Sequence, residues 1–164
     1  MATVYLSLGS NVGDRKANLR RAIIFIWQID GCNIEKESQV YETSPVGGPK
    51  QQDYFNQVIE ISVGLSPYEL LEQLLAFEDL LGRERSVENG PRTIDIDILF
   101  YDDVIIKKKD LILPHPRLHE RLFVLYPLLD IAPDFVHPLY NKTVRELTES
   151  LETLQREQKA KKIE

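Results

Sequence analysis

The fold is decided by the stretch Gly90-Pro91-Arg92-Thr93-Ile94-Asp95-Ile96-Asp97-Ile98-Leu99, in which isoleucine alternates with aspartate. Alternation with period two is typical of a half-buried strand, here predicted over residues 93–100. The isoleucines form the buried face, so Asp95 and Asp97 leave the opposite face with Cα atoms roughly 6.6 Å apart. The stretch therefore predicts a strand that presents two carboxylates side by side.

Two carboxylates held this close repel each other unless a cation lies between them. A divalent ion that is bound through two carboxylates and shared with substrate phosphates fits such a pair, and Mg²⁺ fits it best. An isolated Asp-x-Asp is more often a solvated strand face, so the pair alone leaves both interpretations open. The neighbouring arginines favour the metal.

Three arginines flank the acidic strand. Arg83 and Arg85 follow a predicted helix stop at Gly82, and Arg92 directly precedes the strand. Planar guanidinium groups bind phosphate oxygens in a bidentate manner. Carboxylates for a metal together with three arginines suit phosphoryl transfer, which depends on positioning and charge stabilisation. For Arg83 and Arg85 alone, a solvated charge run is an equally good interpretation.

Outward from this stretch, the chain alternates between strands and helices. Strands are predicted at 3–8, 34–43, 54–63 and 93–100, helices at 15–30 and 67–81, a small hairpin at 104–106 with 111–113, and a last helix from 143. This order indicates an α+β fold, a ferredoxin-like βαββαβ sandwich with an extra hairpin and C-terminal helices. No linker or repeat interrupts it, so residues 1–164 are predicted to form a single domain with a polar tail that frays after about residue 155.

Two of these helices carry clear start signals. Asp14 is predicted to cap the first helix. Ser66 precedes the second, with Pro67 at its first position and Glu69 completing a capping box. A turn is expected at residues 9–14, between the first strand and the first helix.

The composition is that of a globular protein with a formal net charge of −6, from 20 Lys and Arg against 26 Asp and Glu. This balance argues against a protein that coats nucleic acid or an anionic membrane, although a cluster of arginines in one cleft can still bind an anion. Cys32 is the only cysteine, which excludes an internal disulfide and a thiolate zinc site. Without a signal-peptide pattern or a long apolar run, we expect a cytoplasmic protein.

A third polar cluster reads Pro114-His115-Pro116-Arg117-Leu118-His119-Glu120-Arg121. The two histidines are four residues apart, but Pro116 places His115 at or before the start of any helix. A zinc pair is therefore disfavoured. His115 and Arg121 are better interpreted as contacts to a phosphate or a ribose, and the alternative is an ordinary helix N-terminus.

Taken together, these motifs resemble the 6-hydroxymethyl-7,8-dihydropterin pyrophosphokinases of folate biosynthesis. The resemblance runs from about Val4 to Leu129. It is carried by Leu8-Gly9-Ser10-Asn11, Tyr41-Glu42-Thr43-Ser44-Pro45, Tyr54-Phe55-Asn56, Glu78 with Gly82-Arg83-Glu84-Arg85, residues 90–99, and Pro114-His115-Pro116 with Arg121-Leu122-Phe123. The segment at 90–99 is the most specific of these.

The resemblance implies Mg²⁺-dependent transfer of pyrophosphate from ATP to the hydroxymethyl group of a reduced pterin, giving AMP and the pterin diphosphate. Asp95 and Asp97 would hold two Mg²⁺ ions that bridge the ATP phosphates, while Arg83 and Arg92 would contact phosphates and help to close the site. The nucleotide would be bound by Leu71, Glu78, Arg85, Arg92, Ile98, His115 and Arg121, and the pterin by Thr43, Ser44, Val46, Tyr54, Asn56 and Phe123.

One part of this assignment agrees with the residues themselves. Tyr54 and Asn56 share a face of their strand, where an amide can pair its donor and acceptor with a flat heterocycle and an aromatic ring can stack on it. From the sequence alone, Phe123 would be assigned to the core. Many family members carry Trp where this chain has Asn89, which leaves open how residues 86–91 cover the site.

Two other classes of function compete with this one. A ferredoxin-like sensor domain would bind a small ligand without chemistry, but it has no need for the acidic strand and the arginines. A two-metal nuclease is disfavoured by the net charge of −6 and by the lack of a basic stripe. We expect a monomer that acts on small molecules, ATP and the pterin, with no nucleic acid or membrane partner.

Overall fold

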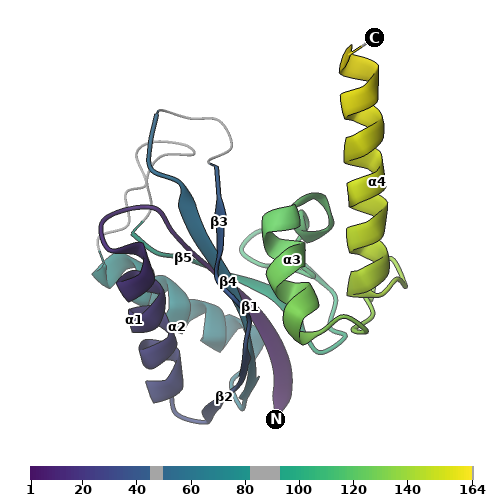
Figure 1. Ribbon diagram of the computed structural model, residues 1–164. Coiled ribbons are helices and arrows are strands. Elements are labelled where there is room, and N and C mark those ends of the chain that lie inside the picture. The colour runs from purple at the N-terminus through teal and green to yellow at the C-terminus, as the bar shows by residue number, and fades with distance from the viewer. Residues whose placement is uncertain (45–49, 82–92, 164) are drawn as a thin grey trace.

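The computed structural model describes residues 1–44, 50–81 and 93–163, with side chains up to residue 158. Figure 1 shows a mixed fold with a central antiparallel sheet. In chain order its elements are β1 (Ala2–Ser10), α1 (Arg15–Gln28), β2 (Cys32–Glu37), β3 (Tyr41–Thr43), β4 (Tyr54–Val63), α2 (Pro67–Leu80), β5 (Asp95–Tyr101), β6 (Ile106–Lys107), β7 (Ile112–Leu113), the 3-10 helix η1 (Leu118–Glu120), α3 (Leu122–Ile131) and α4 (Val144–Ile163).

The sheet has the strand order β2-β4-β1-β5, and β3 pairs with β4. β1 is the central strand and runs antiparallel to both of its neighbours. Its register places Gly9 between Asn56 of β4 and Asp95 of β5. Residues that are 39 positions apart in the chain are thereby brought to the two sides of one glycine.

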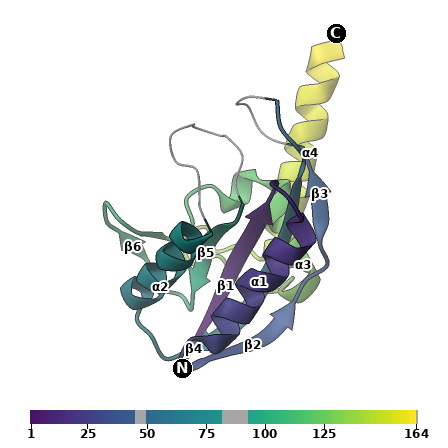
Figure 2. The ribbon, with the colours of Figure 1, turned by 90° about the vertical axis from the view of Figure 1, so that its left-hand side faces the viewer.

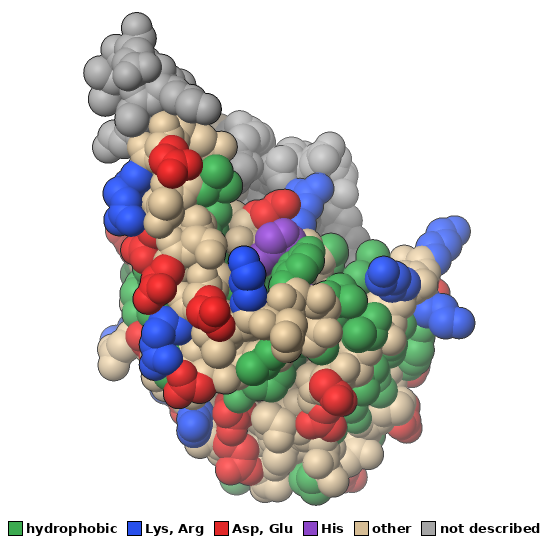
Figure 3. Space-filling model, turned by 90° about the vertical axis from the view of Figure 1, so that its right-hand side faces the viewer, with side chains coloured by type: hydrophobic (Ala, Val, Ile, Leu, Met, Phe, Trp, Pro, Cys, Tyr) green, Lys and Arg blue, Asp and Glu red, His purple; other side chains and the backbone are tan. Residues whose placement is uncertain are grey.

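Helices cover both faces of the sheet: α1 and α2 lie on one side, and α3 and α4 on the other (Figures 1 and 2). The first core lies beneath α1 and α2 and contains the isoleucines of β5, as their alternation predicts. The second core joins the sheet to α3 and α4 through Tyr5, Val58, Phe100 and Leu128. α4 packs its first turns on this core, and Figure 3 shows acidic and basic side chains mixed along its outer surface.

The strand predicted at 34–43 is wrong as a single element, because the structure divides it into β2 and β3. The break occurs at Ser38, whose backbone N–H donates to the Val58 carbonyl at 2.9 Å. Its Oγ accepts the Val58 N–H, also at 2.9 Å, and its carbonyl accepts the Gln57 side-chain amide. A side chain that replaces a ladder partner interrupts regular pairing, and period two alone does not reveal it.

Smaller differences concern where the elements end. Gly9 and Ser10 belong to β1 rather than to the predicted turn, since they pair with Asn56 and Phe55 of β4. The first helix ends at Gln28, two residues before the predicted end. α4 continues as helix to Ile163, past the point at which the sequence predicts fraying. The predicted helix stop at Gly82 lies outside the described residues.

The predicted helix starts are confirmed. Asp14 accepts a hydrogen bond from the Ala17 N–H at 3.1 Å. Ser66 and Glu69 form both bonds of the capping box, at 3.2 and 3.0 Å, and these bonds lower the pKa of the Glu69 carboxyl. A second capping box, between Thr143 and Glu146, begins α4.

None of the helices in the described part of the chain is long and apolar enough to cross a membrane.

Replacing Ser66 with Ala removes the cap of α2, so we expect a loss of about 1 kcal/mol in the free energy of unfolding. For a chain of this length that corresponds to a fall in Tm of about 2–4 °C. Thermal unfolding followed by circular dichroism measures the change. Ser150→Ala, on the exposed surface of α4, is the control and should cause no loss. Equal Tm values for Ser66→Ala and wild type would contradict the prediction.

Candidate functional site

A cleft of about 400 Å³ opens between the sheet and the segment that leads into α3. Its floor is the end of β1, with Ser7 and Gly9, and the adjacent end of β5, with Asp95 and Asp97. The remaining lining residues lie in or beside β3, β4, η1 and α3: Thr43, Ser44, Tyr54, Asn56, Arg117, Glu120, Arg121, Phe123 and Val124. Five segments of the chain thus meet around one cavity.

Both carboxylates of the acidic strand line this cleft, as the alternation predicts. In the register of the sheet, Asp95 lies opposite Gly9 and Asp97 opposite Ser7, while Ile96 lies opposite Leu8 on the buried face. The two acids therefore share a floor whose neighbouring β1 side chains are absent or small. This leaves room for a ligand above them.

Gly9 keeps that floor open. A Cβ atom at this position would lie 3.2 Å from Asn56 Oδ1 and 3.6 Å from Tyr54 Cδ1. The Asn56 amide is held in place by donating to Thr43 Oγ1 at 2.6 Å. Glycine is thus required here because strand β4 presents its polar side chains at close range, and not because of an unusual backbone conformation.

One wall of the cleft gathers the residues that the sequence assigns to the pterin. Thr43, Ser44, Tyr54, Asn56 and Phe123 all line it. Phe123, which sequence reasoning alone would place in the core, is only half-buried at the start of α3. The remaining member of the set, Val46, lies outside the described residues.

The same cleft is also lined by cations. Arg121 lines the cleft as predicted, with its guanidinium carbon 5.6 Å from the centroid of the Phe123 ring. Arg117 and Glu120 line it as well, and the sequence analysis gave neither of them a role. The signal for Arg117 was present, since it lies in the cluster at 114–121 and is four residues before Arg121.

His115 lies beside the cleft rather than in its lining. Its Nδ1 accepts the backbone N–H of Arg117 at 3.2 Å, which leaves the proton of the neutral ring on Nε2. Burial and the charge of Arg121 lower its pKa to about 4, with a smaller contribution from Arg117 and against the opposing effect of Asp95. At neutral pH His115 is therefore an uncharged hydrogen-bond donor.

Three other residues of the expected nucleotide set lie on the core side of β5. Ile98 is buried in the first core, and Leu71 packs against that core from α2. Glu78 is only 1% exposed, and its carboxylate accepts the backbone N–H of Ile96 at 3.1 Å. In the described part of the chain, none of the three belongs to the lining of the cleft.

Three further arginines are predicted to contact the substrate phosphates. Arg83, Arg85 and Arg92 all fall outside the described residues, as does Asn89. Their predicted roles stay predictions.

The cleft suits a metal that is shared with a substrate. Within residues 1–44, 50–81 and 93–163, no group of three or more His, Cys, Asp or Glu side chains is arranged to hold an ion. Asp95 and Asp97 supply two carboxylates in one cavity. A hard cation such as Mg²⁺ commonly binds to one or two protein carboxylates when phosphate oxygens complete its coordination.

Residues 5–133 match the family model of 7,8-dihydro-6-hydroxymethylpterin-pyrophosphokinase. The chain belongs to this family. The match includes every described residue that lines the cleft.

Curated relatives include the 2-amino-4-hydroxy-6-hydroxymethyldihydropteridine pyrophosphokinase of Bacillus subtilis, 47% identical over 78% of this chain and 77% of its own length. The enzyme of that name from Aquifex aeolicus is 45% identical and covers 89% of this chain and 90% of its own length. The bifunctional protein FolKE of Lactococcus lactis is 44% identical over 94% of this chain, which spans only 45% of that longer protein.

Solved structures agree on the fold. The HPPK-DHPS of Plasmodium falciparum superimposes with a TM-score of 0.76 at 16% identity over 96% of this chain. An HPPK-DHPS in complex with substrates gives a TM-score of 0.74 at 15% identity over 94% of this chain. This chain spans about half of those proteins, 46% and 44% respectively.

The state of His115 gives a testable prediction. Burial lowers the pKa of His115 and of His137 to about 4, below the ordinary 6.5. Both rings should therefore stay neutral in the metal-free protein as the pH falls from 8 to about 5. As the pH falls, these histidines bind protons in the unfolded chain at a higher pH than in the folded protein. The free energy of unfolding should therefore decrease as the pH falls from 6.5 toward 4.

Proton NMR of the ring C–H groups measures the first effect, and denaturant titrations at several pH values measure the second. His115→Gln identifies the His115 resonance and should reduce the pH dependence of stability. A His115 midpoint near pH 6.5 would contradict the prediction.

Proposed function

We propose that the chain transfers pyrophosphate from ATP to the hydroxymethyl group of 6-hydroxymethyl-7,8-dihydropterin in folate biosynthesis, with Asp95 and Asp97 as the ligands of Mg²⁺. The family and the names of the relatives support the reaction. The observation that carries the assignment to this cleft is the meeting of Asp95 and Asp97 with Thr43, Tyr54, Asn56 and Phe123 around one cavity.

The pterin occupies the wall formed by β3, β4 and the start of α3. Asn56 offers one amide donor and one acceptor, and its Thr43 contact fixes the orientation of that amide. Tyr54 and Phe123 supply aromatic surface for the flat ring. Since Asn56 and Asp95 lie on opposite sides of Gly9, a pterin on this wall directs its substituent toward the carboxylates.

The triphosphate occupies the part of the cleft between the carboxylates and the cations. Mg²⁺, for which we propose two ions, neutralises phosphate charge at Asp95 and Asp97. Arg121 and Arg117 line the same cleft and can donate to phosphate oxygens. Arg83 and Arg92 are proposed to add to this set and to balance charge on the leaving and transferred groups, with Leu71, Glu78, Arg85, Ile98 and neutral His115 around the nucleotide.

The chemistry is a displacement at the β-phosphorus of ATP by the substrate hydroxyl. The bond between the β-phosphorus and the α–β bridging oxygen breaks, so AMP leaves with that oxygen and the diphosphate stays on the pterin. No described side chain in the cleft is an obvious general base, so catalysis rests on alignment of the two substrates and on stabilisation of charge.

We also propose that the fold is the ferredoxin-like βαββαβ sandwich with an added hairpin and C-terminal helices. The strand order supports this if β2 and β3 are counted as one interrupted strand. In addition, we propose that residues 1–164 form one domain that works as a cytoplasmic monomer.

Asp97→Asn should keep the fold and lose turnover, because it removes one of the two carboxylates while preserving shape. We expect AMP formation to fall by at least about 100-fold, as for other losses of charge stabilisation at a reacting phosphate. The assay contains ATP, Mg²⁺ and 6-hydroxymethyl-7,8-dihydropterin, and circular dichroism checks the fold. Asp103→Asn, an exposed acid just after β5, is the matched control. Activity of Asp97→Asn near that of wild type would refute the metal assignment.

The identity of the leaving group tests the reaction itself. Phosphorus NMR of the complete reaction should show AMP and a pterin diphosphate as the only phosphorus products. ADP with a pterin monophosphate would place the attack at the γ-phosphorus and would return the chain to the ordinary kinases.

A further inference from the structure

The pterin wall contains a short strand with little support of its own. β3 has three residues and, in the described part of the chain, pairs with β4 alone. We call residues 41–44 and 53–56 the β3–β4 arm. On its cleft side this arm presents Thr43, Ser44, Tyr54 and Asn56. The β4 part of the arm pairs with β1, and Tyr41 of β3 donates to Asp130 of α3 at 2.9 Å. The three β3–β4 residue pairs at the sheet edge give β3 little further support.

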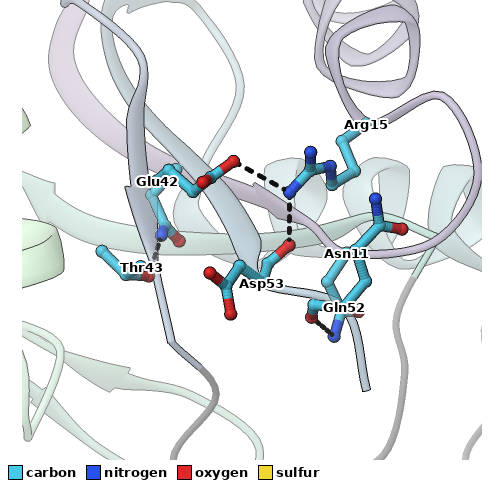
Figure 4. A network of polar contacts seen from close by, with 7 residues as sticks. Asn11, Arg15, Glu42, Thr43, Gln52 and Asp53 are labelled. Atoms are coloured by element: carbon cyan, nitrogen blue, oxygen red, sulfur yellow. Dashed lines mark hydrogen bonds and ion pairs between the residues drawn. The ribbon is translucent and has the colours of Figure 1, made fainter.

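Arg15 contacts the back of this arm (Figure 4). Its guanidinium donates to the Glu42 carboxylate at 3.1 Å and to the Asp53 carbonyl at 2.9 Å. Its central carbon lies 3.9 Å from the centroid of the Phe55 ring. Glu42 and Phe55 are partners across the β3–β4 ladder, so the Arg15 side chain contacts both strands of the arm.

The position of Arg15 in its own helix shows that these contacts do not serve α1. Arg15 is the first residue of α1, and no acidic residue lies in the first turn of that helix. A cation at this end opposes the helix dipole, so it costs helix stability instead of adding to it. Within the described residues, the hydrogen bonds and the ring contact of the Arg15 side chain are all with the arm.

The start of α1, which carries Arg15, is itself held by hydrogen bonds. The Asn18 side chain donates to Ser10 Oγ at 3.2 Å and to the Val12 carbonyl at 2.8 Å, which ties the start of α1 to the end of β1. Asn11 adds hydrogen bonds to Gln51 and to the Gln52 carbonyl. Movement of β3 relative to β1, which carries Gly9, must therefore break the Arg15 bond to Glu42.

We propose that Arg15 is a positioning residue for the pterin: by joining Glu42, Asp53 and Phe55 it holds the β3–β4 arm so that Thr43, Tyr54 and Asn56 face the substrate in a fixed arrangement. The proposal rests on the proposed function of the cleft. It places Arg15 outside the reaction, since its contacts lie on the face of the arm that is turned away from the cavity.

Arg15→Gln should raise KM for the dihydropterin by about tenfold, because substrate binding then has to order the arm. KM for ATP and kcat should change by less than about twofold, since the carboxylates and the cationic residues of the cleft do not depend on the arm. Arg15→Lys keeps the charge but cannot make both hydrogen bonds and the contact with the Phe55 ring together, so we expect an intermediate KM.

Arg20→Gln is the matched control. Arg20 also lies on α1 and pairs with a glutamate of the sheet, Glu37 of β2, at 3.5 Å, but none of the residues in that pair lines the cleft. Its KM values for both substrates should equal those of wild type.

Hydrogen exchange followed by mass spectrometry measures how readily the backbone of the arm opens, and it does so in the absence of catalysis. Peptides that cover residues 41–44 and 53–56 should exchange faster in Arg15→Gln and not in Arg20→Gln. Unchanged exchange, or faster exchange with an unchanged KM for the pterin, overturns the proposal. An equal rise in both KM values overturns it too, since that pattern indicates a general structural effect.

These readouts separate the two hypotheses. If the wild-type protein forms no AMP, the proposed function fails and the link between Arg15 and the pterin fails with it. The exchange experiment then still decides whether Arg15 holds the arm. If wild type forms AMP and Arg15→Gln behaves like Arg20→Gln, only the role of Arg15 is overturned.

Discussion

The pairing of β1 with both β4 and β5 is the constraint on which the rest of the structure depends. It places Gly9 between Asn56 and Asp95, and so joins the side chains assigned to the pterin with the carboxylates assigned to the metal. The same pairing buries the apolar faces of the three strands under α1 and α2. Because a sheet alternates its side chains, burying one face fixes what the cleft face presents.

Charge in the cleft is divided between two parts of the fold. The acids belong to the sheet, whereas Arg117, Glu120 and Arg121 come from η1 and the residues beside it. Backbone bonds hold the two sides together, since the N–H of His115 donates to the Leu99 carbonyl of β5 at 2.9 Å. Buried Glu78 supports the acidic strand from behind by accepting the Ile96 N–H. In the proposed function, a substrate with several phosphates would meet opposite charges on two supports, which would limit the reorganisation needed for transfer.

Local sequence rules gave correct predictions for features that depend on the residues of a single strand or helix. The alternation at 93–100 predicted the acidic face of β5, and Ser66 with Glu69 predicted the start of α2. These rules failed at Ser38, where a side chain bonds to the neighbouring strand. They also failed at Gly9, which looks like a turn residue and instead pairs within β1. In both cases the answer depends on β4, which lies about 20 or more residues further along the chain.

The sequence by itself determined which faces are apolar, where two helices start and that Asp95 and Asp97 share a face, because these properties follow from the period of the backbone. The residues quoted for the resemblance also pointed to the family that the comparison confirms. Tertiary packing was needed to bring Arg117 and Glu120 to the cleft, Phe123 to its border and Arg15 into contact with the β3–β4 arm. These facts depend on contacts between residues far apart in the chain. No local pattern encodes them, since strand order and helix packing are set by burial across the whole molecule.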